Sequence, residues 1–304
     1  MITDIHEVTL RNVSFLFIEK MLQHEKCAYF SEEQKERVRK AYELADTLHL
    51  SQERHNNTPY IYHIDRSVKI YLTQTLHEWE LCDPRYLIWL ILHDCIEDND
   101  NWLIEIIKKN FGISIIVDIL FMSKPTRRVI SQVMKIKQTH EEIYQQLQLV
   151  WLIQLYVLIL ENNPEKFIKN LQPDESISKE MHKKLVILWN NTYKKKYLFE
   201  KDLAHKHKIY AEFIFLSLIS CMQPNLFRIK ATERRDNMQD IDGLLSEHKV
   251  KSALWTMFTT MEIYVPRARE IGDSRLVENL INDRNNERAR FVEAKLIEPD
   301  LIWE

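Results

Sequence analysis

Apolar side chains recur at positions i, i+3, i+4 and i+7 along most of the chain. This spacing places them on one face of an α-helix, whereas a half-buried strand alternates apolar and polar residues. Only three glycines and eight prolines interrupt the pattern, so the frequent turns that short strands need are missing. We therefore predict an all-α protein. The predicted helices span residues 13–23, 31–48, 62–75, 84–97, 102–110, 113–122, 129–161, 178–196, 202–221, 225–239, 249–271 and 274–294.

The middle of the chain differs from its flanks. Residues 135–201 contain long apolar runs, turn-like segments around two prolines, and a lysine cluster at 194–196. We therefore expect one domain over residues 1–304, with a helical insertion at about 130–200. The most apolar run, 150–160, is about half as long as the ~20 residues that span a bilayer, which favours a buried helix. Its stripe of Trp151, Leu155 and Leu158 is either core or a contact in a homo-oligomer.

Composition excludes several classes of protein. The glycines at 112, 243 and 272 are too far apart for a dinucleotide-binding motif, a Walker motif or a nucleophile elbow, each of which needs closely spaced glycines. With 42 basic and 45 acidic residues the net charge is -3, so binding to a nucleic-acid polymer is not expected. Four scattered cysteines without a C-x-x-C pair, and no apolar signal core at the N-terminus, predict a cytoplasmic protein that does not enter a membrane.

The clearest chemical signal is the segment RYLIWLILHDCIEDND at residues 85–100. A nearly unbroken apolar helix ends there in His93, Asp94, Glu97 and Asp98, which pair at i, i+4 on adjacent stripes. Imidazole and carboxylate together suit a divalent ion such as Mn²⁺, with spare carboxylates to handle a water. The alternative is a helix end that runs into an acidic loop, although the helix dipole disfavours acids at that end.

Two further polar patches flank this segment, RHNNTPYIYH at 54–63 and IKATERRDNM at 229–238. Together with Phe111-Gly112, Ser123-Lys124 and TTMEIYVPRAREIG at 259–272, they occur in the order and spacing of a known family. The chain resembles the hydrolase domain of RelA/SpoT-type alarmone enzymes, a branch of the HD-domain phosphohydrolases. The resemblance covers about residues 31–122 and 205–278 and implies an HD-type helical bundle.

The resemblance also implies roles for individual residues. His63, His93 and Asp94 would bind the metal, and Glu97 and Asp98 would position and deprotonate the attacking water. The fourth metal ligand of the family is an aspartate, and Glu233 stands at that position; Asp236, one turn on, would be its substitute if Glu233 did not reach the ion. The implied substrate-binding residues are Arg54 on the guanine base, His55 where a lysine is common, Lys124 and Asn237.

Plainer interpretations exist for several of these residues. By itself, His63 between two tyrosines is typical of a core histidine, and Arg54 and Asn237 of surface or capping residues. Lys124 is either a phosphate contact or part of a helix terminus. Ile64 replaces the proline that usually follows the first histidine of the family, which we expect to affect packing only.

The expected function is a Mn²⁺-dependent hydrolase that removes the 3'-pyrophosphate from guanosine tetra- or pentaphosphate. The chain ends at Glu304, where the synthetase domain of the larger enzymes would begin, so it resembles a stand-alone hydrolase. One alternative is the same chemistry on another phosphorylated nucleotide. The other is a nucleotide-binding or regulatory protein that has lost turnover, suggested by Glu233 and by the large insertion.

Overall fold

Every regular element in the described part of the chain is a helix. The computed structural model describes residues 16–54, 57–98, 102–123, 216, 219–220, 223–240 and 250–297. These residues contain no strand, and the nearest feature to one is an isolated bridge between Glu53 and Pro59. The prediction of an all-α fold is confirmed.

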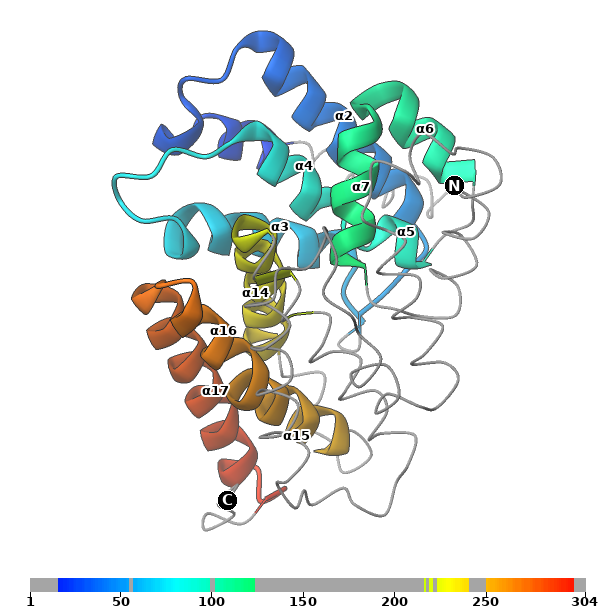
Figure 1. Cartoon of the computed structure of the whole chain (residues 1–304). Coiled ribbons are helices and arrows are strands. Elements are labelled where there is room, and N and C mark those ends of the chain that lie inside the picture. Colours follow the sequence, from blue (N-terminus) through cyan, green and yellow to red (C-terminus); the bar gives the residue numbers. More distant parts are fainter. Residues whose placement is uncertain are drawn as a thin grey trace, which may run out of the picture. The chain divides into compact units, whose positions relative to one another are not determined.

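Figure 1 shows the described helices, coloured in the order in which they occur along the chain. Residues 16–22 are helical and lead into a 3-10 turn, η1. The elements are η1 (Glu25–Cys27), α2 (Glu32–His49), α3 (Ile61–Ile70), η2 (Tyr71–Thr75), α4 (Pro84–Leu92), α5 (Cys95–Asp98), α6 (Trp102–Phe111), α7 (Ile113–Met122), α14 (Pro224–Gln239), α15 (Val250–Thr259), η4 (Thr260–Tyr264), α16 (Val265–Glu270) and α17 (Ser274–Glu293). Both η2 and η4 are π-helical turns that continue the helix before them.

One predicted helix is interrupted, and the prediction of an unbroken helix over 84–97 was wrong. The helix α4 ends at Leu92, residues 93–94 form a turn, and α5 begins at Cys95. His93 Nδ1 lies 2.7 Å from the carbonyl oxygen of Leu90, which occupies a backbone acceptor at the end of α4. Such a bond from a side chain to the backbone competes with continued helix. The predicted helices at 129–161 and 178–196, and almost all of 202–221, lie outside the described residues.

Local sequence signals explain where several helices begin. Ser31 and Gln34 form a capping box at the start of α2, with bonds of 3.2 and 2.9 Å. Asp83 accepts from the backbone N–H of Arg85 at 2.8 Å at the start of α4, and Pro84 occupies the first helical turn, where its missing N–H costs nothing. Between α6 and α7 the chain turns at Gly112, whose φ of 85° favours glycine.

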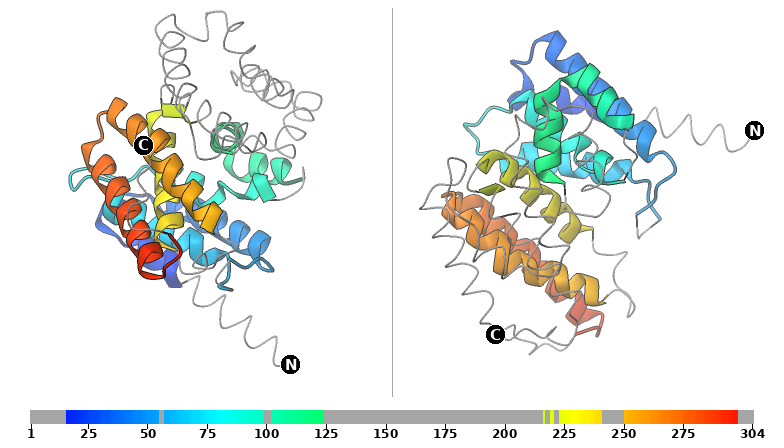
Figure 2. Two further views of the ribbon diagram at one scale, coloured as in Figure 1. Left: turned by 90° about the horizontal axis from the view of Figure 1, so that it is seen from below. Right: turned by 45° about the vertical axis from the view of Figure 1, so that its right-hand side comes forward.

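The core forms around α4, a helix that is apolar on nearly all sides and buried from Leu87 to Leu92. It packs against α2, α3, α7 and α14. The elements α15, η4 and α16 form one continuous run that packs along α17. On the other side, α14 lies between this two-helix layer and the helices α3 and α4 (Figures 1 and 2).

Helix α14 is buried although its sequence is rich in charged residues. Its buried side chains include Lys230, Glu233, Arg234, Arg235 and Asp236. Buried charges are costly unless they are paired, and Arg235, for example, lies 2.6 Å from an oxygen of Asp283 on α17. A buried charged helix beside the apolar, buried helix α4 marks the region where chemistry is to be sought.

The chain divides into two compact units, one of Met1–Met122 with Pro224–Glu304 and the other of Ser123–Gln223. All the helices named above belong to the first unit. The predicted insertion at about 130–200 lies outside the described residues. Among the helices that are described, none has the length and apolar character needed to cross a membrane.

Candidate metal centre

Three side chains that could hold a metal ion converge where α3 meets the turn after α4. They are His63 on α3, and His93 and Asp94 in the turn. All three are buried, and each offers one ligand atom within 4.8 Å of the others. The Oδ2 atom of Asp94 is 2.9 Å from His93 Nε2 and 3.6 Å from His63 Nε2. The two histidines and the aspartate that the sequence singled out are therefore brought together.

The hydrogen bonds of both imidazoles leave their Nε2 atoms to face the centre. His93 Nδ1 is 2.7 Å from the Leu90 carbonyl, which can only accept, so Nδ1 carries a proton. His63 Nδ1 is 2.6 Å from Asp236 Oδ2, so that nitrogen donates to a carboxylate. Metal-binding histidines are typically oriented by such a bond from the second ring nitrogen. Both rings thus direct Nε2, the nitrogen that could bind a metal ion, toward Asp94.

The contact between His93 and Asp94 indicates that a cation could be bound at this position. His93 is 1% exposed, and its Nε2 has no hydrogen-bond partner among the described residues. A lone pair on Nε2 and a carboxylate oxygen 2.9 Å away repel each other unless a proton or a metal ion lies between them. A divalent ion would satisfy both atoms, so these donors fit a metal.

Asp94 is held in its ionised form. Burial by itself raises the pKa of this carboxyl, but His93 and the hydrogen bond to His63 outweigh it and hold the pKa well below its ordinary value. The hydroxyl of Tyr60 donates a hydrogen bond to Asp94 Oδ2. The Tyr60 ring also stacks on His49, with centroids 4.4 Å apart, which fixes the hydroxyl in place.

Glu233 faces the centre from α14 but has a competing partner. Its Oε2 atom is 3.8 Å from His93 Nε2 and 2.5 Å from the Nζ atom of Lys230, one turn earlier on the same helix. It does not belong to the group whose ligand atoms all lie within 4.8 Å of one another. The position that the resemblance assigns to a fourth ligand therefore holds a buried carboxylate next to the centre, ion-paired with a lysine.

Asp236, expected as a substitute ligand, contacts His63 on the side of the ring that faces away from Asp94. Its carboxylate binds Nδ1 of His63, the nitrogen on the other side of the ring from the one that faces Asp94. Burial lowers the pKa of His63, but the bonds to Asp236 and Asp94 raise it, and the net direction is upward.

Two of the predicted substrate-binding residues lie at the edge of the centre. Arg54 Nη2 donates to Asn237 Oδ1 at 2.8 Å, and the Asn237 amide is 3.4 Å from Glu233 Oε1. The guanidinium of Arg54 also lies over the Tyr60 ring, 5.8 Å from its centroid. Arg54 and Asn237 are thus connected to the residues around the triad from two sides.

Four other predicted residues cannot be placed. His55 and Lys124 lie outside the described residues. Glu97 and Asp98 belong to the helix α5, Cys95–Asp98, but their side chains are outside the described part of the structure. The backbone places both within four residues of Asp94.

Sequence reasoning gave no role to three residues that contact the centre or its immediate partners: Tyr60, Arg66 and Lys230. Each lies three residues along a helix or turn from a residue that was singled out, namely His63 or Glu233. Neighbours at i, i+3 share a helix face, so this spacing was the available signal.

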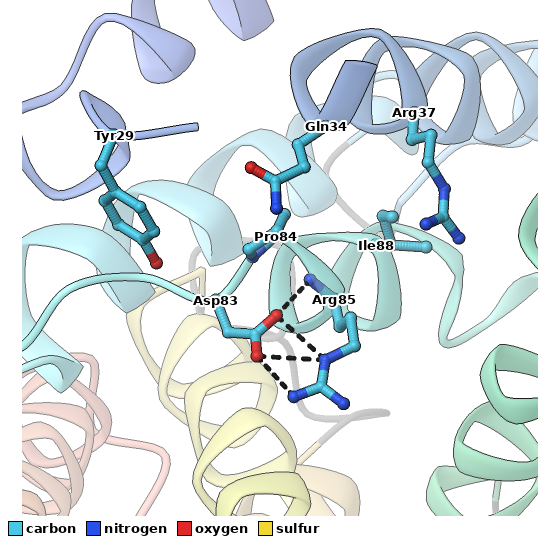
Figure 3. A pocket seen from close by; sticks show the side chains of 7 residues that line it. All are labelled: Tyr29, Gln34, Arg37, Asp83, Pro84, Arg85 and Ile88. Carbon is cyan, nitrogen blue, oxygen red and sulfur yellow. Dashed lines mark hydrogen bonds and ion pairs between the residues drawn. The ribbon is translucent and has the colours of Figure 1, made fainter. Parts of the chain in front are cut away.

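A pocket of about 340 Å³ lies elsewhere, at the opposite end of α4 from His93 (Figure 3). It is lined by Tyr29, Gln34, Arg37, Asp83, Pro84, Arg85 and Ile88. Its carboxylate, Asp83, is already satisfied by the Arg85 guanidinium at 2.6 Å and by the start of α4. None of the candidate metal or substrate residues lines this pocket, so it is separate from the centre.

Comparison with known proteins adds no family assignment. No protein-family model matches the chain, and no curated protein matches it. The functional interpretation therefore depends on the residues of the centre and on their geometry.

Proposed function

We propose that this protein is a metal-dependent phosphohydrolase that acts on a phosphorylated nucleotide. The observation that carries the proposal is the buried contact of His93 Nε2 with Asp94 Oδ2 at 2.9 Å, with His63 Nε2 at 3.6 Å from the same oxygen. Two imidazoles, which would lose any Nε2 proton on binding a metal ion, and an ionised carboxylate form a donor set that suits a divalent transition metal, and we propose Mn²⁺. His63, His93 and Asp94 would hold the ion.

A divalent ion bound there would lower the pKa of a bound water and offset negative charge on a phosphate oxygen. The chain itself would supply the proton acceptors. Glu97 and Asp98 on α5 follow Asp94 closely in sequence, and we propose that they take the proton of the attacking water.

Arg54 and Asn237 would bind the nucleotide. A guanidinium is planar and always charged, so it can stack on a base or form paired hydrogen bonds with a phosphate. Arg54 is already orientated by Asn237 and by the Tyr60 ring. The resemblance to RelA/SpoT-type hydrolases suggests guanosine tetra- or pentaphosphate as substrate, cleaved at its 3'-pyrophosphate, with His55 and Lys124 as further phosphate contacts.

One observation favours a second candidate, a nucleotide-binding protein without turnover. Lys230 holds Glu233 at 2.5 Å, so the position of the fourth ligand is partly neutralised. If that ion pair persists in the presence of metal, only three protein ligands remain, and metal binding would be weaker.

The free thiols and the nucleotide substrate fit a cytoplasmic protein. Cys27, Cys82 and Cys95 are buried and form no disulfide. Thiols of this kind are usual in reducing compartments, where phosphorylated nucleotides are also found. We therefore propose the cytoplasm as its location.

The test is an assay of the full chain with a panel of phosphorylated nucleotides. The protein is stripped with a chelator, reloaded with Mn²⁺, and incubated with guanosine tetraphosphate, guanosine pentaphosphate and other nucleoside polyphosphates; the products are resolved by chromatography. Release of pyrophosphate that disappears in Asp94→Asn supports the proposal. Bound nucleotide without hydrolysis would favour the binding protein, and a wild type that binds neither Mn²⁺ nor nucleotide would overturn both.

A further inference from the structure

Asp236 connects the metal centre to an arginine that the proposed reaction does not use. One carboxylate oxygen, Oδ2, accepts from His63 Nδ1 at 2.6 Å. The other, Oδ1, accepts from Arg66 Nε at 2.7 Å, and Arg66 Nη2 lies 3.2 Å from Oδ2. Asp236 is fully buried, so the orientation of His63 depends on a carboxylate that Arg66 holds in place.

The same arginine reaches toward the proposed nucleotide site. Arg66 Nη2 donates to Asp240 Oδ2 at 2.5 Å, and Arg54 Nε lies 3.5 Å from the same oxygen. Asp236 and Asp240 are four residues apart, and the backbone N–H of Asp240 donates to the Asp236 carbonyl at 2.9 Å, so the two carboxylates project from one face of α14 and its continuation. An unbroken path thus runs from His63 to Arg54.

The charges along this path balance. Burial raises the pKa of Asp236, but His63 and Arg66 outweigh it and lower the pKa below its ordinary value. Burial lowers the pKa of Arg66, but Asp236 and Asp240 raise it, and the net direction is upward. Two carboxylates therefore face two guanidinium groups. Asp236 is the fully buried member of this set, so removal of Arg66 would leave a buried carboxylate without its guanidinium partner.

We propose that Asp236 and Arg66 are positioning residues. They fix the orientations of the His63 and Arg54 side chains relative to each other, so that metal binding and nucleotide binding reinforce each other. The inference rests on the proposed function. An element with two arrangements, whose equilibrium both ligands bias in the same direction, makes each ligand raise the affinity of the other by the same factor. Asp236 fixes the proton on Nδ1 of His63, and Arg66 transmits the position of that carboxylate to Arg54 through Asp240.

The experiment uses the full chain and two ligands, Mn²⁺ and guanosine diphosphate. Titration calorimetry gives the affinity for Mn²⁺ alone, and then the affinity for guanosine diphosphate with and without Mn²⁺. The variants are Asp236→Asn, which keeps the shape of the side chain, Arg66→Gln and Arg66→Lys. Circular dichroism and thermal unfolding report whether each variant keeps the fold.

Glu80→Gln is the matched control. Glu80 pairs at 2.8 Å with Arg228, which lies on α14 as Asp236 does. Neither Glu80 nor Arg228 contacts the centre. This variant also replaces a carboxylate by an amide in an arginine ion pair. Its effect on Mn²⁺ affinity measures what the loss of an ion pair on α14 does through the fold alone.

We expect Asp236→Asn to weaken Mn²⁺ binding by about 10- to 100-fold, the range for loss of a partner behind a metal-binding histidine. Arg66→Gln is expected to abolish most of the factor by which Mn²⁺ tightens guanosine diphosphate binding. Arg66→Lys should recover only part of it, because a lysine cannot donate to two carboxylates in a fixed plane. Glu80→Gln should change neither affinity more than about twofold.

The outcomes separate the two proposals. If the wild type binds Mn²⁺ and a folded Asp236→Asn binds it equally well, the positioning role is wrong and the proposed function stands. If Asp236→Asn does not fold, Arg66→Lys decides, and an unchanged dependence of guanosine diphosphate binding on Mn²⁺ overturns the coupling. If the wild type binds no Mn²⁺, the proposed function fails and the positioning role fails with it.

Discussion

Arg54 and Asn237 are 183 positions apart in the sequence, and Arg54 Nη2 donates a hydrogen bond of 2.8 Å to Asn237 Oδ1. The bond fastens the loop before α3 onto α14, beside Glu233. Because the loop also carries Tyr60, which binds Asp94, the same contact brings a guanidinium to the edge of the candidate metal centre. The consequences of this arrangement can be measured.

Arg54→Ala is expected to raise the KM for the nucleotide by about tenfold or more and to change kcat less, because it removes a contact that binds the substrate in the ground state. Steady-state kinetics with the nucleotide hydrolysed by the wild type provide the measurement. Arg39→Ala serves as control, since Arg39 pairs with Glu19 at 2.6 Å and has no role in the proposed site. An unchanged KM in Arg54→Ala would show that Arg54 does not bind the substrate.

Asp94→Ala should abolish both bound metal and hydrolysis, because Asp94 supplies the carboxylate oxygen that lies near the Nε2 atoms of both histidines. Glu97→Gln should leave the metal bound and slow only the chemical step, since its proposed role is to accept a proton. Metal analysis of the purified variants, together with single-turnover rates, checks both statements. A Glu97→Gln enzyme that works at the rate of the wild type would remove Glu97 from the mechanism.

Glu233→Asp is expected to retain bound metal and to cost at most modest activity. The variant keeps the charge, and its carboxylate is one methylene shorter than that of Glu233, so a small movement of α14 is needed for it to reach the ion. It should also lose the close contact with Lys230, now 2.5 Å, which competes for the carboxylate. Mn²⁺ titration of both forms is the measurement. Turnover in neither form would indicate a site that has lost catalysis.

Glu287→Gln should stabilise the protein at alkaline pH. Glu287 is buried on α17, and burial raises its pKa from the ordinary value of 4.5 to about 8. Between pH 4.5 and about 8, Glu287 is ionised in the unfolded chain but still protonated in the folded protein. The free energy of unfolding therefore falls as pH rises, by about 1.4 kcal/mol per pH unit for this group. The neutral amide removes this loss.

The measurement for Glu287 is urea unfolding of wild type and variant at several pH values from 4.5 to 8.5. The gain in Glu287→Gln should grow with pH and level off above about 8. Glu278→Gln, an exposed position on the same helix, is the control and should show no such trend. Asp65 and Asp118, whose pKa values burial raises to about 7, keep some pH dependence in the variant. A gain independent of pH would contradict the assignment of a buried neutral acid.

The sequence by itself determined the local structure. Apolar periodicity predicted helices at 102–110, 113–122 and 274–294, and the structure has them at Trp102–Phe111, Ile113–Met122 and Ser274–Glu293. These features depend on neighbours within four residues, so a linear pattern records them. The pairing of His93 with Asp94 was visible for the same reason, since the two residues are adjacent.

Only the tertiary structure decided which polar groups meet. Nothing in the spacing of residues 54–66 and 229–240 shows that His63 and Arg66 share the carboxylate of Asp236, 173 and 170 positions away. The charged sequence of α14 would suit a solvated helix equally well, and its burial follows from packing against α3, α4 and α17. Helical period fixes the direction of each side chain, but the partner it meets depends on how helices far apart in the sequence pack together.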